Sequence, residues 1–170
     1  MAANKKNKKS ESKVETSTGT HAIKAVIWLY EKPENLKASG FDKELISMLK
    51  DRHSEQQHSF HIRTTESAFW FEQSAVKEGF SELERLRKAG AAVFAAAQKA
   101  SCSVLRLVDV QHNPEHTAAF MEGFILASYR FDSFKKADPK AVYPQIAELV
   151  SDCFKNKDAD ALKEITRAVF

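Results

Sequence analysis

The stretch EGFILASYRFDSFK, residues 122–135, decides the fold of this chain because two periodicities meet in it. Its first half is almost wholly apolar and continues a helix that begins at Asn113 and Pro114, a capping residue followed by a first-turn proline. Its second half, from Tyr129 to Phe134, alternates in the manner of a strand. A helix that leads directly into a strand predicts a layered α/β arrangement.

The same periodicities predict further elements on both sides of this stretch. Residues 22–30 form a β-rich apolar run, which is typical of a strand covered on both faces. Further strands are predicted at 59–64, 68–71, 103–110 and 145–150, and further helices at 41–50, 81–100 and 158–169. The strands at 59–64 and 68–71 are close enough to form a hairpin. We therefore expect an α/β fold with helices on both faces of a mixed sheet.

The helix at 81–100 has two marks of its own. Ser81 and Glu84 have the spacing of a capping box, in which each side chain binds a free backbone N–H at the helix start. Its buried stripe is predicted to consist of Leu83, Leu86, Val93, Phe94 and Ala97.

Charge divides the chain into two parts. The net charge is +3, and residues 1–20 hold five of the 26 basic and two of the 23 acidic side chains, so the other 150 residues carry 21 of each sign. Residues 1–20 are expected to be a disordered basic leader, with a nucleic-acid arm as the alternative, and residues 21–170 one folded domain. Because the folded part carries no net charge, we do not expect it to bind nucleic acid.

Cysteine usage and hydropathy bear on the compartment. Cys102 and Cys153 form no C-x-x-C pair, stand in apolar contexts and are predicted to be buried thiols, which fits a reducing cytoplasm. No apolar run approaches the roughly 20 residues of a membrane-spanning helix, and the first 20 residues lack the apolar core of a secretory signal. We expect a cytoplasmic location and no membrane partner.

The motif His112-Asn113-Pro114-Glu115-His116 has the form H-x-x-E-H of a zinc protease. That chemistry needs both histidines on one helical face, whereas Pro114 belongs in a first helical turn with Asn113 as its cap. His112 is then outside the helix and His116 inside it, so we expect a capped helix start with partly exposed imidazoles.

Other constellations are also expected to be structural. His53, His58 and His61 match no standard ligand spacing and are predicted to lie on a solvated face. The five glycines are scattered and no G-x-S-x-G occurs, which counts against a phosphate loop and a serine nucleophile elbow. Aromatic residues at strand spacing are expected in the core rather than as stacking platforms; they are Phe69, Trp70, Phe71, Tyr129, Phe131 and Phe134.

Residues 122–135 resemble the Glu-Gly … Tyr-Arg-Phe-Asp-x-x-Lys segment near the end of the N-terminal domain of the leucyl (cytosol) aminopeptidases. The order of elements over residues 22–170 is similar to that domain as well. The apolar finish at 168–170 has no helix stop signal, as expected of a boundary just before a second domain.

This resemblance implies a three-layer α/β/α sandwich that is similar to macro domains. It implies that the parent enzymes remove N-terminal residues from peptides with two divalent metals, Zn or Mn, held in a C-terminal catalytic domain, and that they are commonly hexamers. None of those catalytic motifs occurs here, so we assign no catalytic, cofactor-binding or metal residue to this chain.

Two hypotheses follow. The first is a non-catalytic domain whose partners are its own catalytic domain and neighbouring subunits of a homo-oligomer. The alternative is a macro-like module that binds ADP-ribose or a related nucleotide, which rests on fold analogy alone.

Overall fold

The computed structural model describes residues 25–75, 79–129 and 143–154, together with residues 158, 160–162 and 164. Within these residues the elements follow the order β1 (Ala25–Tyr30), η1 (Pro33–Ser39), α1 (Lys43–Ser54), β2 (Ser59–Arg63), β3 (Ala68–Gln73), α2 (Phe80–Lys99), β4 (Val104–Asp109), α3 (Pro114–Ser128) and β5 (Gln145–Ser151). The expected α/β alternation is confirmed, and the predicted bounds agree with these to within a few residues.

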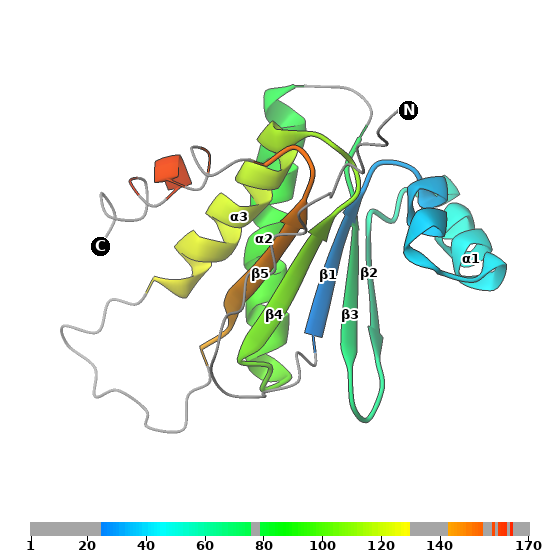
Figure 1. The fold of residues 1–170 in the computed structure, drawn as a ribbon, viewed down its shortest axis with the longest axis horizontal. Coiled ribbons are helices and arrows are strands. Elements are labelled where there is room, and N and C mark those ends of the chain that lie inside the picture. The colour runs from blue at the N-terminus through cyan, green and yellow to red at the C-terminus, as the bar shows by residue number, and fades with distance from the viewer. Residues whose placement is uncertain are drawn as a thin grey trace, which may run out of the picture.

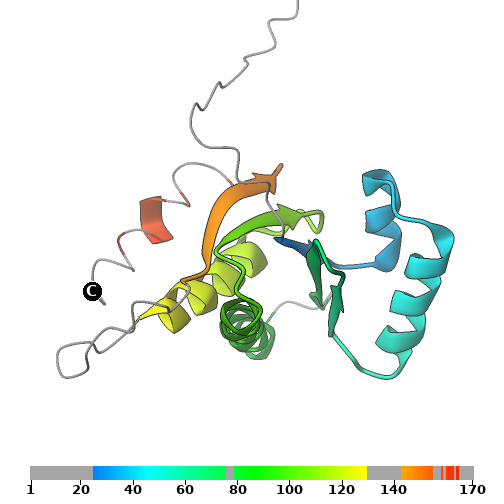
Figure 2. The ribbon, with the colours of Figure 1, turned by 90° about the horizontal axis from the view of Figure 1, so that it is seen from below.

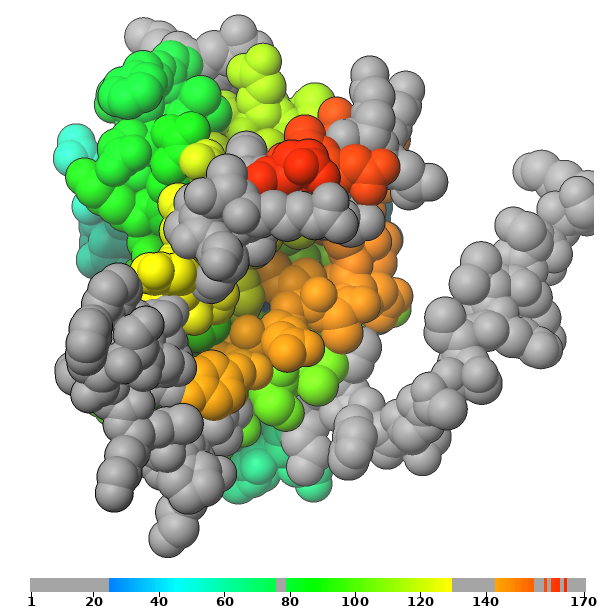
Figure 3. Space-filling view, turned by 90° about the vertical axis from the view of Figure 1, so that its left-hand side faces the viewer, coloured from blue at the N-terminus to red at the C-terminus, as the bar shows by residue number. Residues whose placement is uncertain are grey.

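The five strands form one mixed sheet in the order β2-β3-β1-β4-β5 (Figure 1). Strand β1 pairs in parallel with β3 on one side and β4 on the other, and β4 pairs in parallel with β5. Only β2 runs antiparallel, as the first arm of the predicted hairpin with β3. The second sheet edge, β5, reaches the molecular surface in the space-filling view (Figure 3). Val150 of this strand is 42% exposed.

Helices flank both faces of the sheet, but unequally: α2 and α3 lie along one face, whereas η1 and α1 lie on the other side at the β3–β2 end (Figure 2). Helices α2 and α3 pack on one face over a cluster that includes Ile27, Leu107 and Phe120. Helix α1 and the 3-10 helix η1 pack on the other face, where the cluster includes Leu49 and Phe71. The chain leaves β1 toward η1 and α1 on one face but leaves β3 toward α2 on the other, and this divergence positions the pocket described below.

The predicted buried stripe of α2 is confirmed, but its predicted capping box is wrong. Leu86, Val93, Phe94 and Ala97 are buried and Leu83 is partly buried against the same cluster. The N-cap is Gly79, two residues earlier than predicted, and no side chain caps the helix. Glu82 rather than Glu84 therefore occupies the third helical position, because the helix starts directly after Gly79 and before Ser81.

Three smaller expectations also differ from the structure. Tyr129 follows α3 directly and is 40% exposed, so it is not a core residue. Cys102 and Cys153 are free but only half-buried, since each lies at a strand end rather than inside a layer. Phe69, Trp70 and Phe71 do pack in the core as expected.

Several predictions fall on residues that the structure does not describe. They are the leader at 1–20, Phe131 and Phe134 of the predicted strand, and most of the last helix. In that helix the residues at 158, 160–162 and 164 are helical, and Leu162 is buried.

Candidate functional site

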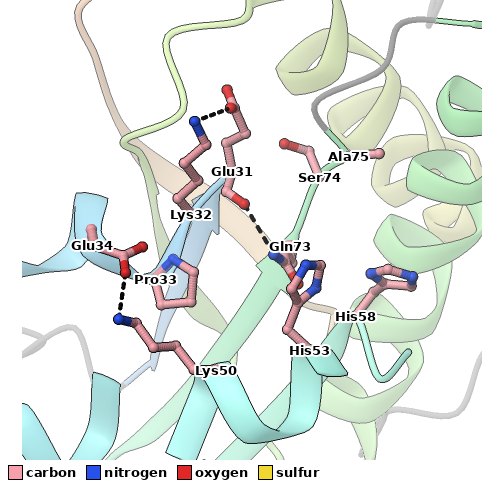
Figure 4. A pocket seen from close by; sticks show the side chains of 10 residues that line it. All are labelled: Glu31, Lys32, Pro33, Glu34, Lys50, His53, His58, Gln73, Ser74 and Ala75. Atoms are coloured by element: carbon pink, nitrogen blue, oxygen red, sulfur yellow. Dashed lines mark hydrogen bonds and ion pairs between the residues drawn. The ribbon is translucent and has the colours of Figure 1, made fainter. Parts of the chain in front are cut away.

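A pocket of about 510 Å³ opens at the carboxyl ends of β1 and β3 (Figure 4). The chain leaves β1 toward η1 and α1 on one face, whereas it leaves β3 toward α2 on the other. Neighbouring strands whose connections diverge in this way leave a crevice, which is where ligands bind in open α/β sheets. The pocket is lined by Glu31, Lys32, Pro33, Glu34, Lys50, His53, His58, Gln73, Ser74 and Ala75.

Gln73 and Ser74 at the end of β3 supply the buried polar part of the pocket. Each is only 2% exposed. The backbone N–H of Ser74 donates to the carbonyl of Tyr30 at 2.9 Å, and the Gln73 amide Nε2 donates to the carbonyl of Glu31 at 3.0 Å. The Oγ of Ser74 is buried and has no hydrogen-bond partner among the described residues, whereas the Gln73 side chain forms a hydrogen bond with His58.

Two histidines form one wall of the pocket. The rings of His53 and His58 meet edge to face with their centroids 6.0 Å apart. Burial lowers the pKa of His58 and the nearby Arg85 guanidinium lowers it further, against the opposing effects of Glu82 and of a side-chain hydrogen bond with Gln73.

This arrangement corrects the expectation for the histidine cluster. His61 is exposed and stacks on Trp70 at 4.8 Å, and His53 is exposed, as expected of a solvated face. His58 is half-buried instead, because it precedes β2 and its carbonyl pairs with the backbone of Gln73.

Two ion pairs flank the mouth of the pocket. Lys32 lies 3.7 Å from Glu31, and Lys50 lies 2.5 Å from Glu34. The hydrogen bond from Lys50 lowers the pKa of Glu34. The four side chains are between 31% and 63% exposed, so the mouth carries both signs of charge in partial contact with water.

An ion pair from α2 fixes the end of β3. Arg85 donates to both carboxylate oxygens of Glu82 and to the carbonyl of Gln73, while Glu82 accepts the backbone N–H of Ala75 at 2.8 Å. Burial by itself would raise the pKa of Glu82, but these hydrogen bonds lower it. The floor of the pocket is therefore held in place by the first turn of α2.

A second polar cluster lies at the carboxyl end of β4. The Oδ2 of Asp109 accepts hydrogen bonds from Thr117 and Ser151, each at 2.8 Å, and from the Cys153 thiol at 3.2 Å. Its Oδ1 accepts the backbone N–H of Gln111. Burial raises the pKa of Cys153, and Asp109 raises it further. The hydrogen bonds of Asp109 therefore tie β4 to α3 and to the end of β5. The Cys153 thiol stays protonated and is not a nucleophile.

The H-x-x-E-H motif does not assemble a metal site. Asn113 caps α3 by accepting the backbone N–H groups of Glu115 and His116, as predicted. His112 is exposed and outside the helix, with φ at 60°, whereas His116 is 3% exposed in its first turn. The expectation of a partly exposed His116 is wrong, because α3 lies flat on the sheet and turns this face inward. Across the described residues, no three His, Cys, Asp or Glu side chains gather closely enough to hold a metal ion.

Sequence reasoning missed Gln73 and Ser74. The signal was present, since the polar run at 72–74 directly follows the apolar strand at 68–71, and polar residues after a buried strand mark a ligand-binding edge. The length of the apolar run did not show that the strand continues through Gln73.

Residues 77–138 match the model of the cytosol aminopeptidase family, N-terminal domain. The predicted resemblance to this domain is confirmed. The matched range of the aminopeptidase N-terminal domain contains α2, β4 and α3, the elements that support the pocket floor and the Asp109 cluster.

A solved structure of a tomato leucine aminopeptidase mutant is similar to this chain in fold. The match has a TM-score of 0.61 at 11% identity and covers 91% of this chain, but only 35% of that enzyme's chain. This chain thus spans about a third of the length of the tomato enzyme, and the likeness shows the fold alone. A search of curated proteins finds no match.

None of the helices in the described parts of the chain is long and apolar enough to cross a membrane.

Proposed function

We propose that this chain is the non-catalytic N-terminal domain of a leucyl-aminopeptidase-like two-metal exopeptidase. Its role is to position the catalytic domain or to join subunits into a homo-oligomer such as a hexamer. The observation that carries the proposal is the family match over residues 77–138. The two divalent metals, Zn or Mn, then belong to the catalytic domain, and the protein is cytoplasmic.

One surface residue supports a packing role. Phe80 opens α2 inside the matched range and is 79% exposed, which makes it the most exposed large apolar side chain among the described residues. A phenyl ring on the surface gains free energy when a partner covers it. The neighbouring Glu82–Arg85 pair would hold the helix start rigid during such contact.

The proposal is tested with the 170-residue chain by one set of measurements. Its mass in solution is determined by light scattering over a concentration series, and its turnover of leucine p-nitroanilide is measured with Zn²⁺ or Mn²⁺. We expect no turnover above the metal blank, and self-association that Phe80→Ser weakens.

The matched control is Phe60→Ser, which alters a half-buried phenylalanine outside the matched range and is checked for folding by circular dichroism. Robust metal-dependent turnover would refute the non-catalytic role. A monomer at all concentrations that also fails to bind an aminopeptidase catalytic domain in trans would refute the packing role.

A further inference from the structure

We propose that the sheet face over β4 and β5, on the side of η1 and α1, is the surface on which a second copy of this chain docks. The inference rests on the packing role proposed above and deepens it, because it names a surface and its partner. This surface is separate from Phe80, which opens a helix on the other face of the sheet.

The helices η1 and α1 leave this part of the sheet open. They pack over the face near β2 and β3, and neither lies over β4 or β5 (Figure 2). The strand register shows which side chains share the open part, since Trp28 pairs with Val108 and Val108 pairs with Val150. Leu105 and Leu107 of β4 point to the opposite face, where α2 and α3 cover them.

Apolar side chains make up most of the open face. Val150 is 42% exposed. Three half-buried apolar side chains share the face with it: Val26, Trp28 and Val104. An exposed apolar patch of this kind marks an interaction site, and two sheets can pack face to face through such surfaces.

One ion pair makes this surface complementary to itself. Arg106 donates two hydrogen bonds, 2.8 and 2.5 Å long, to Glu148 of the neighbouring strand, and the two side chains are 44% and 39% exposed. A two-fold dimer uses the same patch on both copies, so Arg106 can face Glu148 of the partner subunit and Glu148 can face the partner's Arg106. A patch with one charge of each sign suits a second copy better than it suits the basic residues 1–20.

The first test determines the mass of the 170-residue chain by light scattering over a concentration series. We expect a monomer–dimer equilibrium. Arg106→Glu and Glu148→Arg each place two like charges on this face, so each variant alone should dimerise at least about tenfold more weakly. An equimolar mixture of the two variants should recover dimerisation, because each copy then offers the charges that the other lacks.

Recovery in the mixture separates contacts between chains from contacts within one chain. The ion pair within the chain is broken in both variants, so only pairing between two copies can restore the association. The matched control is Lys50→Glu, which breaks the exposed ion pair with Glu34 outside this surface and should leave the mass unchanged.

Val150→Ser tests the apolar part of the surface. The substitution counts twice in a two-fold dimer, and we expect it to weaken dimerisation at least about fivefold. Leu126→Ser alters a side chain of α3 that is 37% exposed on the other face of the sheet, and it should leave dimerisation unchanged. Circular dichroism checks that each variant is folded.

Three results would overturn the proposal. They are a monomer at all concentrations up to about 500 µM, single charge variants that dimerise like the wild type, and a mixture that dimerises no better than either variant alone.

Other occupants give different results, each of which would also overturn the second copy as partner. A dimer that forms only after removal of residues 1–20 would assign the face to that segment. A monomer that binds an aminopeptidase catalytic domain in trans, and loses this binding with Val150→Ser, would assign the face to that domain. Dimerisation that Phe80→Ser weakens but the charge variants do not would overturn this surface and leave the packing role above intact.

Discussion

At the residue scale, Glu72 is a carboxyl group placed inside the protein. It is 3% exposed on β3, and the Ser59 hydroxyl donates to its Oε2 at 2.6 Å. Burial raises its pKa from 4.5 to about 7, against the opposing effects of Ser59 and Arg85. The folded protein therefore binds a proton more tightly at this site than the unfolded chain does.

This shift makes stability depend on pH. Because the folded pKa lies above the unfolded one, the stabilisation is fully present below pH 4.5 and is lost as the pH rises through 7. Glu72→Gln removes the titration, so at pH 8 we expect the variant to be more stable than the wild type by up to about 3 kcal/mol. Urea unfolding at pH 5 and pH 8 measures this difference.

The control for this prediction is Glu66→Gln, which changes an exposed carboxyl group in the β2–β3 turn and should behave as the wild type at both pH values. If Glu72→Gln shows the same loss of stability between pH 5 and pH 8 as the wild type, another group is responsible for the pH dependence.

At the scale of elements, α2 and α3 pack with their backbones in contact. Gly90 of α2 faces the carbonyl of Phe120, and Gly123 of α3 faces the carbonyl of Arg87, and a Cβ atom at either glycine would overlap these backbone oxygens. Around this contact Arg87 pairs with Glu122 at 2.7 Å. Two glycines that are far apart in the sequence thus form one helix–helix contact.

Gly123→Ala tests which effect wins at this contact. Helix propensity alone predicts that alanine stabilises α3 by about 1 kcal/mol. The overlap with Arg87 forces the helices apart, so we expect destabilisation by about 1–3 kcal/mol instead. Thermal or urea unfolding gives the sign directly.

Ala95→Gly on the exposed face of α2 calibrates the propensity term and should cost about 1 kcal/mol. A Gly123→Ala variant that is more stable than the wild type would show that the helices do not approach as closely as described.

At the scale of the whole molecule, both layers share one sheet. The two tryptophans of the chain report on them separately. Trp70 lies in the cluster beneath α2 and α3, and Trp28 packs against the cluster beneath η1 and α1, with its ring 4.9 Å from Phe41. Loss of either helical layer would expose one face of strands that the other layer also needs. The two layers should therefore unfold together.

The variants Trp28→Phe and Trp70→Phe each leave one tryptophan as a reporter. Neither indole N–H group has a hydrogen-bond partner in the described part of the chain, so neither substitution removes a hydrogen bond seen there. For each variant, unfolding is followed by tryptophan fluorescence and by circular dichroism on the same sample. We expect the two midpoints to coincide within each variant. A fluorescence transition that precedes the loss of helix in one variant would show that its layer unfolds independently.

The elements themselves could be predicted from the sequence because their periodicities are local. The apolar run of β1, the alternation in β2 and the Asn113–Pro114 start of α3 each need only neighbouring residues. The start of α2 could not be placed, since its first turn is fixed by Glu82 and Arg85 reaching the distant end of β3. The resemblance carried by residues 122–135 was likewise a local signal.

The sequence by itself determined the α/β class, the hairpin and the family resemblance, because these depend on residue types at short spacing. Only the tertiary structure decided that Gln73, Ser74 and His58 meet Glu31 and Lys50 around one pocket, and that Gly90 and Gly123 lie at the contact between two helices. The physical reason is that strand order and helix crossing bring together residues from separate segments, and no pattern within one segment records which other segment will lie beside it.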